Sequence, residues 1–240
     1  MPITEIIVCL LVPGSDICGA NNSAGAALRD TVDGLRKHTG CQQFTAGMQL
    51  EHADMLEALI SRPLISVLSL AECTLADTST IAVAWESLQK HYDFRRTPDY
   101  EPVVASIGKI RGSPYTPYHV DFRPFTAFMR ATEAPVTEVA TFYFDGSAPT
   151  AVLDRFTRFR EVLSKQQVSG VLGAAAGLTH EELDSEGVRG TAAVLVIGWE
   201  SVDAHLAFQK TQLFKDSVHL LPVAEAKRID MVRLHDMIWV

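Results

Sequence analysis

The chain has 240 residues, of which 47% are hydrophobic, and it carries a formal net charge of −8 at pH 7. This acidic balance argues against binding to nucleic acid or to an anionic membrane surface. There is no apolar run as long as a membrane span, and the N-terminal segment lacks the basic residues that begin a signal peptide. We therefore expect a cytoplasmic protein. The cysteines show neither a Cys-x-x-Cys pair nor a zinc-type spacing, so we expect free thiols.

Apolar periodicity and turn residues divide the first half into short elements. In chain order they predict a strand from Ile3, a Gly/Asn/Ser-rich loop over Pro13–Gly25, a helix that ends near His38, a strand over Phe44–Glu51, an additional helix within Asp54–Glu72, a strand over Ile81–Ala84, a second helix, and a strand over Pro117–Phe122.

The second half shows the same order more clearly. It predicts a strand over Thr137–Phe144, a helix from Val152 to Leu163, a strand over Val171–Leu178, a polar loop over Thr179–Gly187, a strand over Thr191–Trp199, a helix capped by Ser201, and a strand over Lys227–Leu234. This order, β-α-β-β-α-β, is the ferredoxin-like arrangement. The segment Arg123–Pro135, which joins the halves, contains three large apolar residues, so we expect it to pack against the protein.

One segment occurs twice. WESLQKHYDFRRT begins at Trp85, and WESVDAHLAFQKT begins at Trp199. The opening strands also match, ITEI from Ile3 and VTEV from Val136. A repeat this long indicates two copies of a small domain, which we place at residues 1–126 and 133–240. Each four-stranded sheet has helices on one face only, so we expect the bare faces of the two sheets to cover each other.

The strand–Trp–Glu–Ser–helix block, with its following His and aromatic residue, resembles the dimeric α/β barrel superfamily. That superfamily includes antibiotic-biosynthesis monooxygenases, stress-responsive α/β-barrel proteins and polyketide cyclases. The chain is similar to a tandem version of the kind found in fungal secondary metabolism. The resemblance implies an α+β fold in which two fused ferredoxin-like repeats form an intramolecular dimeric α/β barrel. It also implies activities without metal or nucleotide, such as cyclisation, decarboxylation, isomerisation or oxygenation of polyketide-like compounds.

A second patch, from Pro117 to Phe122, resembles the Pro-x-His-Val-x-Phe segment of the plant polyketide cyclase and stress-responsive branch. The resemblance assigns the role of general base to His119. Strand alternation places His119 and Asp121 on one face and Tyr118, Val120 and Phe122 on the other. We expect the polar pair to face the helices, with Asp121 orienting His119. In the second half Asp230 falls near the His position, which suggests that the first half keeps the chemistry.

Other candidates are side chains that could hold a substrate. A tyrosine hydroxyl could hold a carbonyl or enolate, and Tyr118 is the catalytic candidate of this type. The substrate-binding candidates are Tyr143, His52, Tyr115 and Trp85. Because both halves keep Trp85 and Trp199, and likewise His91 and His205, packing explains these four residues more simply.

No Gly-x-Gly-x-x-Gly, P-loop, Gly-x-Ser-x-Gly or His-x-x-x-His pattern is present, so we expect no cofactor and no metal. The sequence favours a cofactor-independent enzyme of natural-product biosynthesis that acts on a small apolar oxygenated substrate by proton transfer and preorganisation. Two alternatives stay open. One is a cofactor-free monooxygenase of phenol or anthrone substrates, and the other is a non-catalytic small-molecule-binding stress-response protein. Whether the fused pair dimerises further also stays open.

Overall fold

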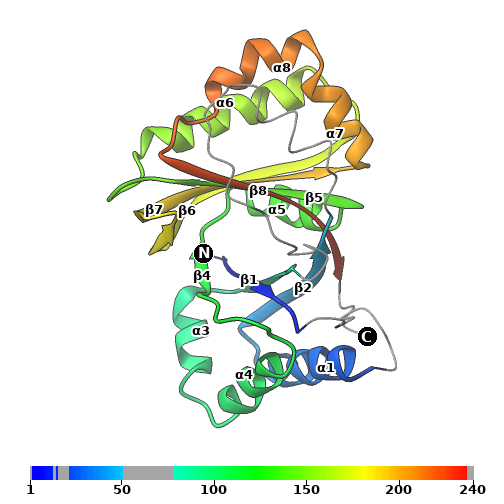
Figure 1. The fold of residues 1–240 in the computed structure, drawn as a ribbon, viewed down its shortest axis with the longest axis vertical. Helices are drawn as coiled ribbons and strands as arrows, with labels where there is room; N and C mark the ends of the chain where they lie inside the picture. The colour runs from blue at the N-terminus through cyan, green and yellow to red at the C-terminus, as the bar shows by residue number, and fades with distance from the viewer. Residues whose placement is uncertain (1, 13–14, 16–21, 51–77, 237–240) are drawn as a thin grey trace.

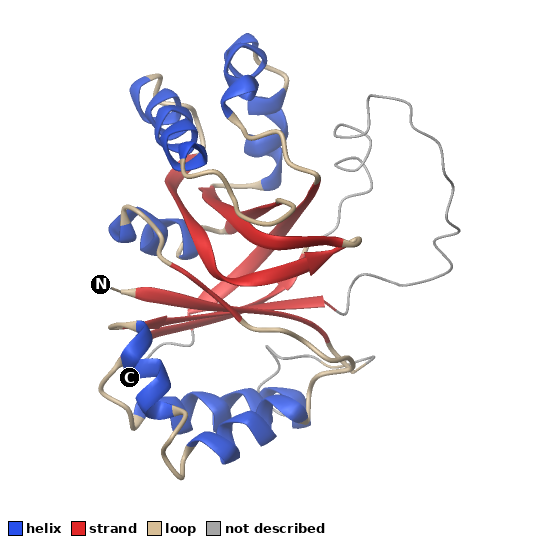
Figure 2. Cartoon of the chain, turned by 90° about the vertical axis from the view of Figure 1, so that its left-hand side faces the viewer, coloured by secondary structure: helices blue, strands red, loops and turns tan. Residues whose placement is uncertain are grey.

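The structure is a computed structural model that describes residues 2–12, 15, 22–50 and 78–236. Its strands form one closed barrel, and its helices lie in two groups on opposite sides of that barrel (Figure 1, Figure 2). The helices of the second half cover one side and those of the first half cover the other.

The strands of the described residues are β1 (Ile3–Leu10), β2 (Cys41–Gln49), β3 (Thr78–Trp85), β4 (Tyr118–Val120), β5 (Val136–Tyr143), β6 (Val171–Ser185), β7 (Val188–Trp199) and β8 (Ala226–Asp236). The helices are α1 (Ser23–Arg36), α3 (Leu88–Phe94), α4 (Tyr100–Gly108), α5 (Phe125–Thr132), α6 (Ala151–Lys165), α7 (Val202–Gln209) and α8 (Gln212–Ser217), followed by the 3₁₀ turn η2 (Val218–Leu220).

The barrel confirms the predicted fold class. Its strand order is β1-β3-β2-β8-β5-β7-β6-β4, and all neighbours are antiparallel. Each half supplies four adjacent strands in the ferredoxin-like order. The repeat extends to the register, because Ile3 pairs with Trp85 as Val136 pairs with Trp199. The two sheets join along two seams, β2 with β8 and β4 with β6.

Apolar side chains fill three separate layers. One cluster lies inside the barrel and includes Tyr118, Val120 and Phe122, as strand alternation predicts. The other two lie between each sheet and its helices. In the second half, Phe156 and Phe159 of α6 are almost fully buried there, and each such side chain stabilises the fold by about 1.5–3 kcal/mol.

The prediction of a polar loop over Thr179–Gly187 is wrong. β6 continues to Ser185 and pairs with β7 through a bulge between Leu178 and Glu182. The chain reverses at Glu186 and Gly187, which have φ of 55° and 83°, and two successive positive φ values match the twist of a two-residue hairpin. Polar composition misled the interpretation, because one side of this strand extension, with His180, Glu182 and Asp184, is exposed.

The segment that joins the halves forms α5, which packs against β6 and β7 as expected. Its approach to β7 is close, because a Cβ added at Gly198 would lie 2.6 Å from the Cα of Ala131. The predicted loop before the first helix ends at Asn22, whose side chain caps α1 by accepting from the Gly25 N–H. The expected helix within 54–72 lies outside the described residues.

No helix in the described part of the chain is both long and apolar enough to cross a membrane.

Candidate functional site

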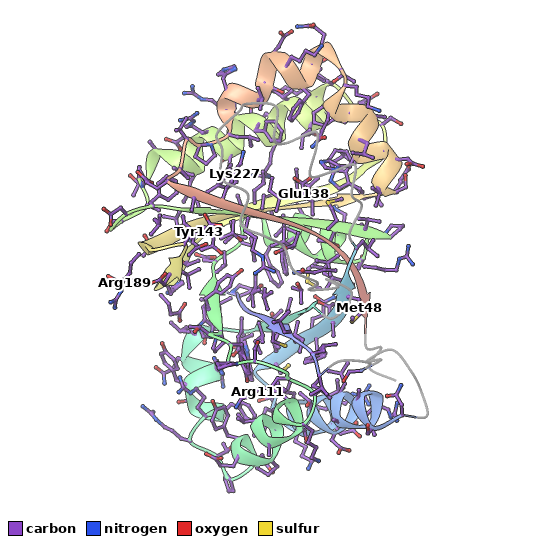
Figure 3. All side chains as sticks on the ribbon, viewed as in Figure 1. Met48, Arg111, Glu138, Tyr143, Arg189 and Lys227 are labelled. Atoms are coloured by element: carbon purple, nitrogen blue, oxygen red, sulfur yellow. The ribbon has the colours of Figure 1, made fainter. Side chains whose placement is uncertain are left out.

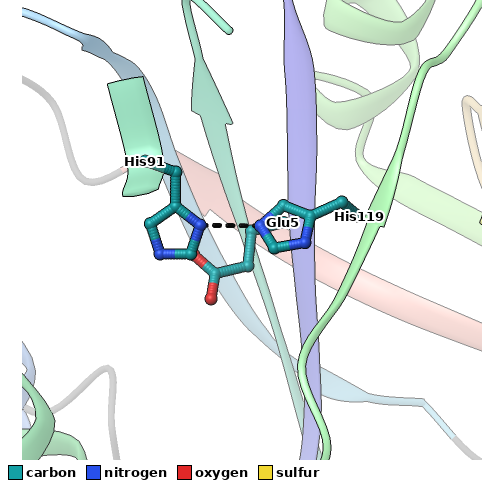
Figure 4. A group of neighbouring side chains, drawn as sticks. All are labelled: Glu5, His91 and His119. Atoms are coloured by element: carbon teal, nitrogen blue, oxygen red, sulfur yellow. Dashed lines mark hydrogen bonds and ion pairs between the residues drawn. The ribbon is translucent and has the colours of Figure 1, made fainter. Parts of the chain in front are cut away.

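The repeat places a carboxylate, an indole and an imidazole together on the helix-facing side of the first sheet. Glu5 lies opposite His119 in the β1–β4 ladder. It shares the face of β1 with Ile3 and Ile7, which pack into the core beneath the helices, since alternate strand residues point the same way. His91 comes from α3, which Ser87 begins by accepting from the Lys90 N–H. Figure 4 shows the carboxylate of Glu5 and the two imidazoles together.

His119 makes its strongest contacts with Glu181, a residue of β6 in the other half of the chain. Its Nδ1 lies 2.7 Å from Glu181 Oε1, and its main-chain N–H donates to Glu181 Oε2 at 2.7 Å. Burial raises the pKa of Glu181, but these bonds from His119 outweigh it and the pKa falls below the ordinary 4.5. Glu181 is therefore a carboxylate, and it holds the His119 ring through Nδ1–H.

His91 fills the other side of the His119 ring. Its Nδ1 lies 2.7 Å from His119 Nε2, and its Nε2 lies 3.6 Å from Glu5 Oε2. Burial, followed by the positive charges of His119 and Arg95, lowers the pKa of His91 from 6.5 to about 3. His91 is accordingly neutral. If His119 is neutral as well and donates through Nδ1, then its Nε2 must accept the Nδ1–H of His91.

Glu5 is held by Trp85, whose Nε1–H donates to Glu5 Oε2 at 3.3 Å. The indole also stacks on His91 with ring centroids 4.8 Å apart. Burial raises the pKa of Glu5, although charge and hydrogen bonding from His119 and Trp85 oppose that shift. A buried carboxyl with a raised pKa is a candidate proton acceptor near neutral pH.

Glu5, His91 and His119 offer ligand atoms within 4.8 Å of one another, so we tested their fit to a metal ion. Two nitrogens on one tetrahedral zinc ion lie roughly 3.3 Å apart. The facing nitrogens of His91 and His119 are 2.7 Å apart, which is a hydrogen-bond distance. The residues as placed fit a shared proton better than a shared metal.

The second half repeats only part of this arrangement. Trp199 donates to Glu138 Oε2 at 3.0 Å, and His205 Nε2 lies 3.6 Å from the same oxygen. Opposite Glu138 stands Met231, so the residue equivalent to His119 is a thioether. Asp230, which the sequence placed near this position, is the residue next to it, opposite Val139, and it forms an ion pair with Arg228. His205 Nδ1 is buried and has no hydrogen-bond partner among the described residues.

A small cavity of about 50 Å³ lies between the second sheet and its helices. Glu138, Trp199 and His205 all line it. The equivalent surface of the first half is formed by Glu5, Trp85 and His91.

Tyr118 and Tyr143 belong to a different place, at one end of the barrel. They line a cavity of about 360 Å³ together with Arg189, Arg228 and Asp230. Figure 3 shows Tyr143 and Arg189 at the same edge of the molecule. Burial raises the pKa of both phenols, which also lie near each other. Since His119 points to the helices and Tyr118 into the barrel, the structure does not bring this catalytic pair together.

The remaining candidates are dispersed. Asp121 forms an ion pair with Arg123 at 2.6 Å, so the expectation that it orients His119 is corrected to Glu181. Tyr115 packs on the edge of the first core beside Arg111. Trp85 lies within the His91 cluster. His52 lies outside the described residues.

Sequence reasoning missed Glu181, Glu5 and His91. Glu181 was assigned to a solvated loop, although Thr179, Glu181 and Leu183 stand at every second position, a spacing that could have indicated a strand. Glu5 sits at a matched position of the two opening strands, where a charged residue in an apolar run was the available signal. His91 was assigned to packing because both halves have it.

No protein-family profile matches the chain, and no curated protein matches it in sequence. Solved structures nevertheless share its fold along almost the whole chain. A candidate monooxygenase from Fusobacterium nucleatum covers 97% of this chain and 92% of its own, with a TM-score of 0.57 and 13% identity. One from Lactobacillus acidophilus covers 97% and 93%, with a TM-score of 0.52 and 8% identity. An anthrone oxidase-like protein covers 98% and 93%, with a TM-score of 0.55 and 11% identity. Such low identities establish the fold alone.

Proposed function

We propose that this protein is a cofactor-independent enzyme that removes a proton from a small, apolar, oxygenated substrate of polyketide type. The observation that carries the proposal is the buried His119, held by Glu181 through both its ring and its main chain. The fold does not need a histidine at this place, because the second half has Met231 there.

His119 and Glu181 form a histidine–carboxylate pair of the type that accepts acidic carbon or phenol protons, either directly or through a neighbouring side chain. The carboxylate fixes the ring orientation and stabilises the imidazolium that forms when a proton arrives. Such proton transfer contributes about 10²–10⁴-fold to a rate. Confinement of a reactive chain in one conformation between sheet and helices supplies the remainder of the acceleration.

The reaction that follows is cyclisation, isomerisation or decarboxylation. Cyclisation and isomerisation begin with removal of a proton, which gives an enolate or phenolate, and the proton is later returned. Decarboxylation breaks the bond to the carboxylate carbon, and the enolate that remains takes up a proton. A site built from imidazoles and carboxylates meets these needs without a redox group. Trp85 packs its ring against His91 and Phe94 and holds the Glu5 carboxylate through its indole N–H.

A second candidate is a cofactor-free monooxygenase. The observation that favours it is the fold shared with two candidate monooxygenases and an anthrone oxidase-like protein. It shares the first step, since an electron-rich carbanion or phenolate is the species that reacts with oxygen. The two candidate functions differ in the next step: the deprotonated substrate either rearranges or reacts with oxygen.

The test uses two probes. The first is 2,4-dihydroxyacetophenone in D₂O, in which exchange of the methyl hydrogens reports proton removal by mass spectrometry. The second is anthrone in an oxygen-electrode cell. Exchange by the wild type that is lost in His119→Ala and kept in His205→Ala supports proton-transfer chemistry. Oxygen uptake with an oxygenated product selects the monooxygenase. Equal rates in wild type and His119→Ala exclude His119 as the base.

A further inference from the structure

We propose that Glu5, His91, His119 and Glu181 form one proton relay, in which Glu5 takes the proton from the substrate and Glu181 passes it to solvent. This inference rests on the proposed function and makes Glu5, rather than His119, the residue that touches the substrate. His91 and His119 then act as carriers between the two carboxylates.

Two hydrogen bonds and one longer ion-pair contact connect the four side chains. Glu181 Oε1 and His119 Nδ1 are 2.7 Å apart, as are His119 Nε2 and His91 Nδ1. The last link, from His91 Nε2 to Glu5 Oε2, is 3.6 Å and must shorten when a proton crosses it. Links of this kind are often long before substrate binds and tighten in the reacting complex.

The exposed fractions of the four side chains indicate the direction in which the proton moves. The side chains of His91 and His119 are each 5% exposed and that of Glu5 is 11% exposed, whereas Glu181 is 32% exposed. Glu181 is therefore the member that water reaches most easily. The proton therefore leaves at Glu181, and the substrate meets Glu5 at the other end of the relay.

The second half offers a comparison for the Glu5 end of the relay. Glu138, Trp199 and His205 line a cavity there, and they are the counterparts of Glu5, Trp85 and His91. Both ring nitrogens of His119 already have protein partners, so a substrate proton reaches neither directly. Glu5 has its Oε2 on Trp85, and burial raises its pKa, as a base for a weakly acidic proton requires.

The protons balance at every link. The relay requires a starting state in which both carboxylates are ionised and each imidazole carries one hydrogen, on Nδ1. The substrate X–H bond breaks as a Glu5 O–H bond forms, and Glu5 then gives its proton to His91 Nε2. His91 Nδ1–H passes to His119 Nε2, and His119 Nδ1–H passes to Glu181. One bond forms for each bond broken, and the substrate keeps the electron pair.

Burial and the nearby positive charge of Arg95 keep His91 from holding the proton. His91 faces His119, Glu5 and Glu181, and the positive charge of Arg95 acts on it and on Glu5. Tyr92 lies beside both rings. Because burial lowers the pKa of His91, a proton crosses this ring without remaining on it.

The relay also limits the reaction class. After one passage both imidazoles carry their hydrogen on Nε2, so a second outward passage requires the rings to turn or exchange protons with water. A passage in the reverse direction restores the starting state at once. The relay therefore suits cyclisation or isomerisation, in which the removed proton is given back.

The experiment measures hydrogen exchange of 2,4-dihydroxyacetophenone by the full-length protein and its variants Glu5→Gln, His91→Ala, His119→Ala and His205→Ala. We expect Glu5→Gln and His91→Ala each to slow exchange by about 100-fold or more, and His205→Ala to keep the wild-type rate. Free imidazole should restore part of the rate in His91→Ala, where it can fill the vacated place, and none in Glu5→Gln. A lost fold cannot produce rescue of this kind.

A second readout needs no turnover. The proton between His91 and His119 should give a strongly downfield imidazole resonance in ¹⁵N-histidine-labelled protein, absent in His91→Ala and His119→Ala and present in His205→Ala. If exchange depends on His119 but not on Glu5 or His91, the relay is overturned and the proposed function stands. If the wild type exchanges nothing, the proposed function fails for this probe. The relay itself falls if the resonance is missing.

Discussion

Met231 occupies the position in the second half that His119 occupies in the first. Each lies opposite the carboxylate of its own half, Glu138 or Glu5, in equivalent strand pairs. The surrounding Trp and His residues are the same in both halves. Because of this one difference, the first half has two imidazoles in contact, His91 and His119. The second half has only His205, whose Nδ1 has no hydrogen-bond partner among the described residues.

Met231→His should place an imidazole next to His205 Nδ1. The single change loses the packing of a side chain that is 2% exposed, so we expect it to lower the free energy of unfolding. In a double-mutant cycle with His205→Ala, the two histidines should couple favourably by about 1 kcal/mol, the net value of one buried hydrogen bond. Urea unfolding of the four proteins measures this coupling. Additive effects would mean that the two positions are not equivalent.

Trp85→Phe and Trp199→Phe should each lower the free energy of unfolding by about 1–3 kcal/mol, because each removes the indole donor of a buried carboxylate. Phenylalanine keeps an aromatic ring beside the histidine. Only Trp85→Phe should also slow hydrogen exchange, since Glu5 is the acceptor in the relay. Similar exchange rates in the two variants would mean that the Trp85 indole has no role in proton removal.

His91 should make the protein less stable in acid. Its pKa is about 3 in the folded state, against 6.5 as the ordinary value. The unfolded chain therefore binds the extra proton first, and the stability that His91 contributes is lost as pH falls from 6.5 towards 3. The slope is at most about 1.4 kcal/mol per pH unit for one proton. Urea midpoints across this window should fall more gently in His91→Gln, with His205→Gln as the matched control.

Tyr118→Phe and Tyr143→Phe should leave the exchange rate unchanged. Both hydroxyls belong to the cavity at the end of the barrel, on the opposite face of the sheet from His119. Tyr118→Phe also removes a hydrogen bond with Thr141, so we expect a loss of stability of about 1 kcal/mol. A large fall in exchange in either variant would place the substrate in the barrel and contradict Glu5 as its contact.

The fold was predictable because the repeat and the apolar periodicity agree with each other. The Trp-Glu-Ser block fixed the end of a strand and the start of a helix in both halves, and the faces of β4 followed from simple alternation. His119 was found because its neighbours resemble a known segment.

The partners of His119 were not predictable for two different reasons. Glu181 is 62 residues away and reaches His119 only because β4 and β6 meet when the barrel closes. A sequence pattern within one half does not predict which strands of the two halves pair with each other. His91 was assigned to packing because His205 matches it, but the difference between the halves lies in the residue facing each histidine.

The seam between β4 and β6 has a consequence for the origin of the site. A base from one half is held by a carboxylate from the other, so neither half expressed alone would contain the pair. In a homodimer both subunits come from one gene. Any substitution therefore alters both sites at once. Fusion of two copies removes that constraint. One copy could then lose its histidine to a methionine while the other evolved independently.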